Sequence, residues 1–398
     1  MFLTNEQLAF RDEVRRFFRD ATPPALRSKV KLGRRLTRDE LRAWHIILDD
    51  RGWVAPAWDP QWGGTGWDPV RLHIFREELQ LAFAPAPLTM NINLVGPVLI
   101  AFGSDEQKRK FLPGVRRLDY FFCQGFSEPN AGSDLVALST RAVREGDHYV
   151  INGQKTWTTL AHQANWMFAL VRTDPLAKKQ QGITYLLIDM ATPGITVRPI
   201  ITIDHDHHVN EVFFDDVRVP VANRIGEENR AWTYAKFLLT NERVGGARTG
   251  IPKARIRLAK EVAATLLVDG RPLGEQERFR ERVAEIEVEL KALEVSYMRV
   301  LSSLAANAQG QPDPLSSLLK LRGSELMQRT SELLMDMAGM VGLPLVPGLL
   351  HADAEHASLL DAWAGNVAQN YFADRATTIF AGSSEIQHNI IAKEVLGL

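Results

Sequence analysis

Two segments in the middle of the chain combine hydroxyl side chains, glycines and a tryptophan in turn-rich sequence. One reads FSEPNAGSDL (residues 126–135) and the other NGQKTWTT (residues 152–159). Hydroxyls can hydrogen-bond to the polar edge of a planar ring ligand, a tryptophan can lie against it, and a glycine allows close backbone approach. The candidate residues are Ser127, Gly132, Ser133, Trp157 and Thr159. The alternative is that these are ordinary turn and strand residues, with Trp157 in the core.

A carboxylate suited to general base chemistry lies in the segment LLTNERVGG (residues 238–246). On a helix, the neighbours of Glu242 at three and four residues are Leu238, Leu239, Gly245 and Gly246. Such a face differs from a solvated salt-bridge face. The glycines leave room for a ligand and cost about 1 kcal/mol each relative to alanine. We therefore interpret Glu242 as a catalytic base, with a structural Glu–Arg pair at a helix interface as the alternative.

The run DHDHHVNE (residues 204–211) contains residue types that could bind a metal ion. The possible ligands are Asp204, His205, Asp206, His207 and His208. The sequence holds no second ligand cluster, and alternating His and Asp residues in one loop rarely complete a tetrahedral site. We therefore predict no metal at this loop.

The elements that must position these residues form three zones. Residues 1–119 are helical in pattern, with capping boxes beginning at Thr4 and Ser104. Residues 120–230 alternate short β-type runs with turn signals, which predicts an antiparallel sheet or barrel and not a doubly wound dinucleotide-binding sheet. Residues 231–398 are helical again, which predicts a helix bundle. Its clearest apolar seam contains Val283, Ile286, Leu290, Leu293, Tyr297, Val300 and Leu304.

Composition limits the classes of function. The formal net charge of −1 gives no electrostatic reason to expect nucleic acid or an anionic membrane as a partner. No stretch approaches the roughly 20 apolar residues that span a bilayer, and charges interrupt the N-terminal apolar runs, unlike a secretory signal. The single cysteine, Cys123, excludes an intrachain disulfide and fits a reducing compartment. We therefore expect a soluble, cytoplasmic protein.

Taken together, these segments resemble the acyl-CoA dehydrogenase family over essentially the whole chain. Besides the two central segments, WGGTG, EEL, GSDEQKRKFLP and EVFFDDVRVP look like family segments and occur in family order. The resemblance implies an α+β multidomain fold. It consists of an N-terminal helical domain (1–119), a central antiparallel β-barrel (120–230) and a C-terminal four-helix bundle (231–398).

The resemblance implies FAD as the cofactor and assigns residues to it. Ser127, Thr159 and the backbone of Phe126 would contact the flavin, and Trp157 would lie alongside its ring. Ser133 would touch the flavin or the CoA pyrophosphate region, and Ser383 is a further expected cofactor contact.

The resemblance also implies a reaction, in which a carboxylate removes the proton α to an acyl-CoA thioester and hydride leaves the β carbon for the flavin. Many members place this glutamate on a C-terminal loop, but here the loop reads IFAGSSEIQ, with Ala381 at that position. A second family arrangement has the base on the first bundle helix, immediately before an arginine, as Glu242 stands before Arg243. Arg243 and Gly246 are then expected at the substrate. The Ala381 amide N–H can still polarise the thioester carbonyl.

Two other functions remain open on the same scaffold. A non-catalytic subunit that supports a partner's site is favoured by Ala381 and opposed by Glu242, and the other is a flavin oxidase or monooxygenase. Family members with a helix-borne base take branched, long or bulky acyl groups, and dicarboxylic or polycyclic substrates stay open. The expected electron acceptor is an electron-transfer flavoprotein.

Two family motifs that complete the FAD site from a neighbouring subunit are altered. Where Arg-x-x-Phe-Gly is expected, residues 270–276 read GRPLGEQ, which keeps Arg271 without the Phe-Gly. Where a glutamine precedes a Gly-Gly turn, residues 336–342 read DMAGMVG. A pyrophosphate needs a cation or several N–H donors. We therefore predict an α2β2 assembly with a second, related subunit. The alternative is a homo-oligomer in which Arg271 and backbone amides suffice.

Overall fold

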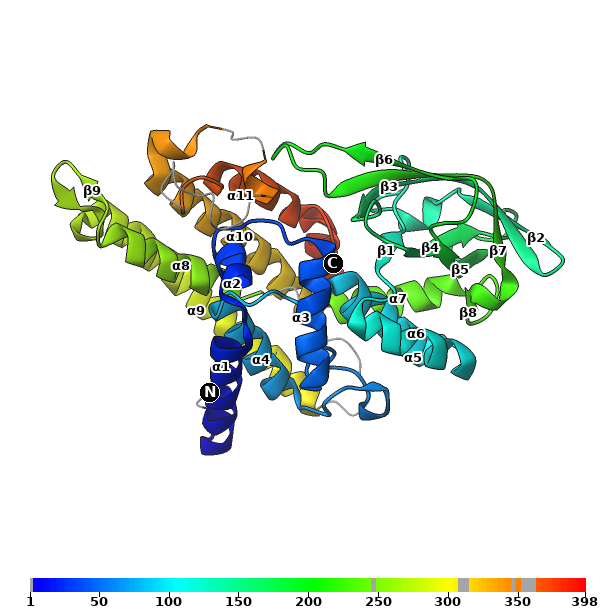
Figure 1. Cartoon of the computed structure of the whole chain (residues 1–398), viewed down its shortest axis with the longest axis horizontal. Helices are drawn as coiled ribbons and strands as arrows, with labels where there is room; N and C mark the ends of the chain where they lie inside the picture. Colours follow the sequence, from blue (N-terminus) through cyan, green and yellow to red (C-terminus); the bar gives the residue numbers. More distant parts are fainter. Residues whose placement is uncertain (1–2, 245–247, 307–314, 345–347, 352–362) are drawn as a thin grey trace. The chain divides into compact units, whose positions relative to one another are not determined.

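The computed structural model describes the chain in two compact units (Figure 1). Unit 1 comprises residues 1–40, 67–86 and 243–398, and unit 2 comprises residues 41–66 and 87–242. Each unit has its own buried hydrophobic cluster. The described residues exclude 1–2, 245–247, 307–314, 345–347 and 352–362, and also exclude the side chains of 239–244 and 304–306.

Unit 1 begins with helices α1 (Asn5–Ala21) and α2 (Pro24–Lys31), and α4 (Pro69–Leu81) returns to it. The predicted capping box is confirmed, since the Gln7 amide donates to the Thr4 hydroxyl at 3.2 Å and the Thr4 amide donates to the Gln7 side chain at 3.0 Å. Helices α1 and α4 pack together through the buried rings of Phe18 and Phe75, whose centroids lie 5.3 Å apart.

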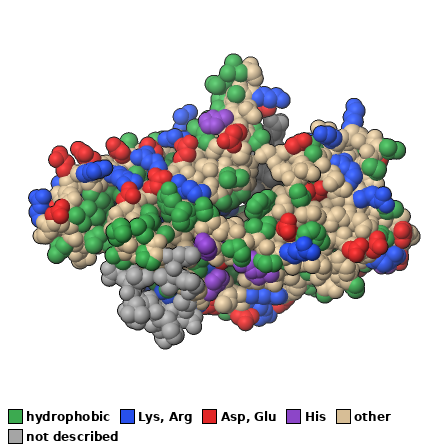
Figure 2. All heavy atoms as spheres, turned by 90° about the horizontal axis from the view of Figure 1, so that it is seen from above, with side chains coloured by type: hydrophobic (Ala, Val, Ile, Leu, Met, Phe, Trp, Pro, Cys, Tyr) green, Lys and Arg blue, Asp and Glu red, His purple; other side chains and the backbone are tan. Residues whose placement is uncertain are grey.

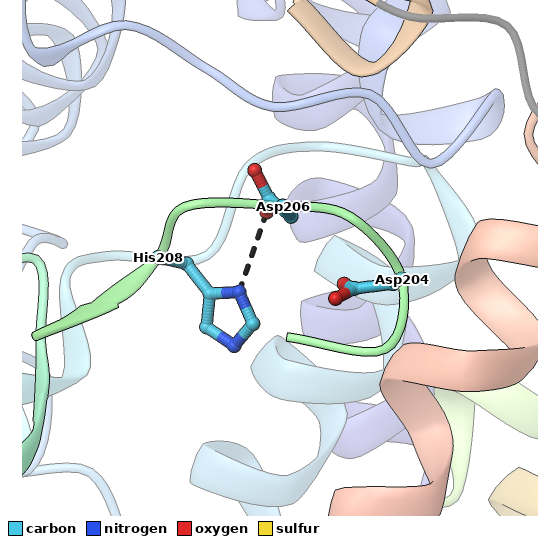
Figure 3. A group of neighbouring side chains, drawn as sticks. All are labelled: Asp204, Asp206 and His208. Atoms are coloured by element: carbon cyan, nitrogen blue, oxygen red, sulfur yellow. Dashed lines mark ion pairs between the residues drawn. The ribbon is translucent and has the colours of Figure 1, made fainter. Parts of the chain in front are cut away.

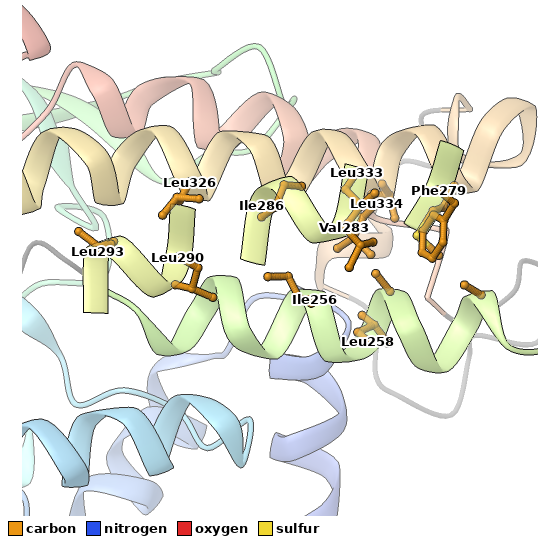
Figure 4. Packing of buried hydrophobic residues seen from close by; sticks show 14 of the residues in the cluster. Ile256, Leu258, Phe279, Val283, Ile286, Leu290, Leu293, Leu326, Leu333 and Leu334 are labelled. Carbon is orange, nitrogen blue, oxygen red and sulfur yellow. The ribbon is translucent and has the colours of Figure 1, made fainter. Parts of the chain in front are cut away.

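The rest of unit 1 is a group of C-terminal helices around one apolar core. The elements are α8 (Gly250–Ala263), β9 (Leu267–Val268), β10 (Arg271–Pro272), α9 (Glu277–Ala306), α10 (Ser316–Ala338), α11 (Val367–Asp374) and α12 (Ser384–Glu394). Figure 4 shows the α9 residues Ile286, Leu290 and Leu293 pointing toward residues of α8 and α10. The predicted seam is buried from Val283 to Val300, while Leu304 lies outside the described side chains.

Unit 2 contains the helices α5 (Gly96–Phe102) and α6 (Asp105–Arg117), together with most of α3 (Arg38–Asp50) and of α7 (Ala231–Val244). The second predicted capping box is also confirmed, because the Gln107 amide donates to the Ser104 hydroxyl at 3.2 Å and the Ser104 amide donates to the Gln107 side chain at 3.0 Å. In the described part of the chain, no helix combines the length and the apolar character needed to cross a membrane.

The sheet of unit 2 corrects one prediction. Its strands are β1 (Phe122–Gly125), β2 (Arg141–Glu145), β3 (His148–Thr159), β4 (Trp166–Arg172), β5 (Ile183–Asp189), β6 (Ile195–Ile200), β7 (Val209–Pro220) and β8 (Arg224–Ile225). Their order is β6-β7-β3-β2-β4-β5-β8, with β1 on β4. Strand β1 runs parallel to β4, and β2 meets β4 in parallel at Arg141. The sheet is therefore mixed, and no closed barrel forms among the described residues. Local alternation predicts that a segment is a strand, but it does not determine the strand's neighbours.

Charge on the surface follows the composition. Acidic and basic side chains are interspersed on the face of the described residues that Figure 2 shows. This pattern agrees with a formal net charge of −1.

Candidate functional site

A β-bulge in β3 creates the main feature of the candidate site. Strand β3 pairs with β7 so that Lys155 opposes Val212 and Thr158 opposes Asn210, which leaves one extra residue on β3 between these pairs. Within the bulge, Trp157 has a φ of +57° and is 60% exposed. A left-handed backbone at a bulky residue costs of order 1–3 kcal/mol, and bulges near active sites redirect side chains. The bulge therefore turns a large aromatic ring out of the sheet, where a ligand can contact it.

The second predicted segment lies against this bulge. The Thr156 amide donates to the Ser127 carbonyl at 2.9 Å, so the structure brings the two segments together, as the chemistry requires. The Phe126 ring is buried against Phe168 and Tyr185, so the predicted cofactor contact of this residue would have to come from its backbone.

The hydroxyls of the two predicted segments suit a planar cofactor with a polar edge. The hydroxyls of Ser127, Ser133 and Thr159 make no hydrogen bond within the described residues, so they are available to a ligand. At Gly132, no atom lies within 4 Å of where a Cβ would stand. Unpaired short hydroxyls beside an exposed indole fit the ring of a flavin.

Sequence reasoning missed the residue beneath the bulge. Lys155 is 0% exposed, and its ammonium lies 2.7 Å from the Glu128 carboxylate. A signal was present, because Tyr149, Ile151 and Lys155 sit at alternating inward positions of β3. A lysine at such a position is almost never fully buried unless it is paired.

The predicted base lies on α7, whose residue Leu238 is buried. Glu242 and Arg243 belong to the last turn of this helix, but their side chains are outside the described part, and so is Gly246. The roles of these three residues therefore remain predictions.

Ala381 and Ser383 belong to unit 1 and lie just before α12, with Ser383 as its N-cap. Ala381 has a φ of +56°, and its amide N–H finds no acceptor among the described residues. The Ser383 hydroxyl accepts from the Ile386 amide at 3.4 Å and so caps α12. Ser383 thus has a structural role of its own, and its predicted cofactor contact remains untested.

The histidine and aspartate run divides into two groups. In the first group, Asp204 and Asp206 are buried, and their carboxylates lie within 4.8 Å of a His208 ring nitrogen (Figure 3). His208 pairs with Asp206 at 3.4 Å. These are three possible ligands from one loop, whereas a structural zinc site has four protein ligands. That no metal binds here remains a prediction.

The second group faces a pocket. His207 stacks on His162 with centroids 4.1 Å apart, and its Nε2 lies 2.7 Å from the Asn210 amide oxygen. These three residues line a pocket of about 350 Å³ beside Met190 and Val197. The sequence alone gave no sign that His162 and His207 would meet, because they come from separate segments.

Comparison with known proteins gives a consistent result along the whole chain. Residues 4–119 match the model of the acyl-CoA dehydrogenase N-terminal domain, residues 123–217 the middle domain and residues 229–396 the C-terminal domain. The acyl-CoA dehydrogenase IpdE1 of Mycobacterium tuberculosis is 36% identical over 367 residues, which are 90% of this chain and 88% of that protein.

Two solved structures are similar in fold. The ChsE4-ChsE5 complex from Mycobacterium tuberculosis matches with a TM-score of 0.81 and 32% identity, covering 100% of this chain and 99% of that chain. The Tcur3481-Tcur3483 steroid ACAD matches with a TM-score of 0.84 and 29% identity, covering 100% and 98%.

Proposed function

The chain belongs to the acyl-CoA dehydrogenase family of FAD-dependent oxidoreductases, and from this premise we propose that it introduces a double bond between the α and β carbons of an acyl-CoA thioester, with Glu242 as the base. The observation that best supports the proposal is the bulge of β3, which exposes Trp157 beside unpaired hydroxyls. Those groups suit a flavin ring, and the family match supplies the chemistry.

In the proposed reaction, the Glu242 carboxylate takes the α proton. The Ala381 amide donates a hydrogen bond to the thioester oxygen, where negative charge develops. That amide is suited to the role because it has no acceptor within the described residues. Bound FAD supplies the acceptor for the hydride that leaves the β carbon. Ser127, Trp157 and Thr159 hold the flavin ring.

Anaerobic mixing of the FAD-loaded protein with acyl-CoA tests this proposal. We expect flavin bleaching with wild type, and a turnover lowered about 10²–10⁴-fold in Glu242→Gln with FAD binding retained. Glu227→Gln is the matched control, since that glutamate is exposed and precedes α7. Near-normal turnover in Glu242→Gln removes Glu242 from the role. Absence of bleaching in wild type favours a non-catalytic subunit, and rapid peroxide formation in air favours an oxidase.

We further propose that the chain works with a second, related subunit in an α2β2 assembly. Arg271 lies in the β9–β10 hairpin, exposed and with no ion-pair partner among the described residues. Asp336 begins the second altered motif, and its carboxylate pairs with Arg282. Neither segment has the complete family motif, and one similar solved structure is described as a complex.

Expression alone and with a related subunit tests the assembly. Poor FAD retention that co-expression restores supports it. A stable homo-oligomer with one tightly held, acyl-CoA-reducible FAD per chain contradicts it.

For the substrate, we propose a bulky acyl-CoA of polycyclic type. The proposal is supported by the predicted helix-borne base and by a similar protein described as a steroid ACAD. The kcat/KM for a polycyclic acyl-CoA should exceed that for butyryl-CoA, and the reverse order refutes the proposal. An electron-transfer flavoprotein is the proposed acceptor, and its reduction in a coupled assay tests that role.

A further inference from the structure

The buried lysine beneath the bulge is fully hydrogen-bonded inside the protein. Its Nζ donates to the Glu128 carboxylate at 2.7 Å, to the Leu170 carbonyl at 2.7 Å and to the Phe126 carbonyl at 3.3 Å. An ammonium has three protons, so Lys155 uses all of its donors inside the protein. The lysine therefore joins β3 and β4 to the segment that contains Phe126 and Glu128.

Glu128 is equally well bonded. One carboxylate oxygen accepts from the Ser139 amide at 2.6 Å and from its hydroxyl at 2.9 Å, and the other accepts from the Thr140 amide at 3.0 Å. Burial alone would raise the pKa of Glu128, but the Lys155 charge and these donors outweigh it and hold the pKa at about 2. The side chain is therefore a carboxylate at neutral pH.

Stability alone does not account for such a pair. Removing two charges from water is costly, and well-packed apolar residues often replace a buried pair with no loss of stability. What a fully bonded pair does provide is a fixed geometry, because each of its bonds has a preferred direction.

The geometry that this pair fixes is that of the proposed flavin contacts. Lys155 is the last β3 residue in register before the bulge, and Trp157 follows two residues later with its left-handed backbone. Between them, the Thr156 amide bonds the Ser127 carbonyl at 2.9 Å. The chain thus anchors both proposed flavin-contact segments at one buried point.

We propose that Lys155 and Glu128 are positioning residues that hold the segment 126–128 and the bulge at Trp157 in the arrangement that binds the flavin ring. This inference rests on the proposed function, since it assumes that these segments contact FAD. Loss of the pair releases the strain at the bulge, and the tryptophan and the hydroxyls then lose their common orientation. The flavin should consequently bind more weakly and in a different environment.

The decisive variant is the apolar double Lys155→Met/Glu128→Met, which leaves no unpaired buried charge. We expect it to keep the wild-type far-UV circular dichroism while its affinity for FAD falls at least about tenfold. The visible band of any bound flavin should lose its fine structure, and its midpoint potential should shift. The measurements use the FAD-loaded protein, co-expressed with a related subunit if the chain alone does not retain FAD.

The matched control is Lys29→Met/Glu40→Gln, which removes a pair with the same 2.7 Å separation around a lysine that is 3% exposed, but in unit 1. It should leave FAD affinity and the flavin spectrum unchanged. Lys155→Arg is a milder variant, for use if the double variant does not fold. The proposal is then overturned if Lys155→Arg keeps the wild-type flavin spectrum, the wild-type FAD affinity and the wild-type hydrogen exchange of the Thr156 amide.

The result that overturns the proposal directly is a folded double variant with wild-type FAD affinity, spectrum and potential. An equal loss of FAD affinity in the Lys29→Met/Glu40→Gln control also overturns the proposal, because removal of any buried ion pair would then have the same effect. Failure of the proposed function is distinguishable in two ways. A wrong role for Glu242 shows only as near-normal turnover in Glu242→Gln, and wrong flavin contacts show as a fully yellow Trp157→Ala/Thr159→Ala variant.

Discussion

His45 should make unit 2 lose stability as the pH falls from about 6.5 toward about 4. The ring lies on α3 with no exposed surface, and Nδ1 lies 2.7 Å from the Arg116 carbonyl. The Leu88 amide donates to Nε2 at 2.8 Å. These two bonds require the neutral ring with its proton on Nδ1.

The sign and the size of this stability change follow from the pKa of His45. Burial lowers the pKa of His45 from 6.5 to about 4, against the opposing effects of the Arg116 carbonyl and Asp49. Between these values the unfolded chain binds more protons than the folded one, so stability is lost on acidification. The full loss is about 3 kcal/mol, at roughly 1.4 kcal/mol per unit. About 2 kcal/mol of it falls between about pH 7 and about pH 4.5.

Urea unfolding of wild type and His45→Gln at these two pH values measures the effect. A glutamine can donate to Arg116 and accept from Leu88 without titrating, so the variant should lose about 2 kcal/mol less on acidification. Burial also lowers the pKa values of His73 and His162, but their contributions cancel in the comparison. His388→Gln, at an exposed position, should behave as wild type. Parallel pH curves for wild type and His45→Gln would refute the reasoning.

Three further outcomes are expected. Replacing Trp157 and Thr159 together by alanine should give a folded but largely colourless protein, because two proposed flavin contacts are lost; a fully yellow preparation contradicts the assignment. Leu290→Ala should lower the free energy of unfolding by about 2–5 kcal/mol, and Val288→Ala, on the exposed side of α9, by at most about 0.5 kcal/mol; equal losses in a urea titration count against the core assignment. The pKa of Glu128 lies at about 2 instead of 4.5. The ionised carboxylate therefore stabilises the folded state fully above pH 4.5, and this contribution is lost as the pH falls through about 2. In Glu128→Gln, the free energy of unfolding should therefore fall less steeply at low pH than in wild type. An unchanged fall would mean that other groups cause it.

Features with a short-range cause were predictable from the sequence. Both capping boxes are confirmed because each depends on two residues three positions apart. The apolar seam from Val283 to Val300 is confirmed because helical spacing places its members on one face. The family, the enzyme class and the cofactor followed from motifs whose order along the chain is visible without coordinates.

Only the tertiary structure determined which strands pair and what lies beneath the predicted flavin contacts. Three features depend on contacts between residues far apart in sequence. They are the parallel pairing of β1 with β4, the bulge of β3 against β7, and the buried bonds of Lys155. His45 likewise meets Leu88 and Arg116 only after folding. Sequence periodicity predicts which side of a strand is buried. The strand register and the desolvation of each side chain depend on the segment that packs against it. The sequence by itself therefore determined the elements and the motifs, while the folded chain determined the bulge, the buried charges and the shifted pKa values.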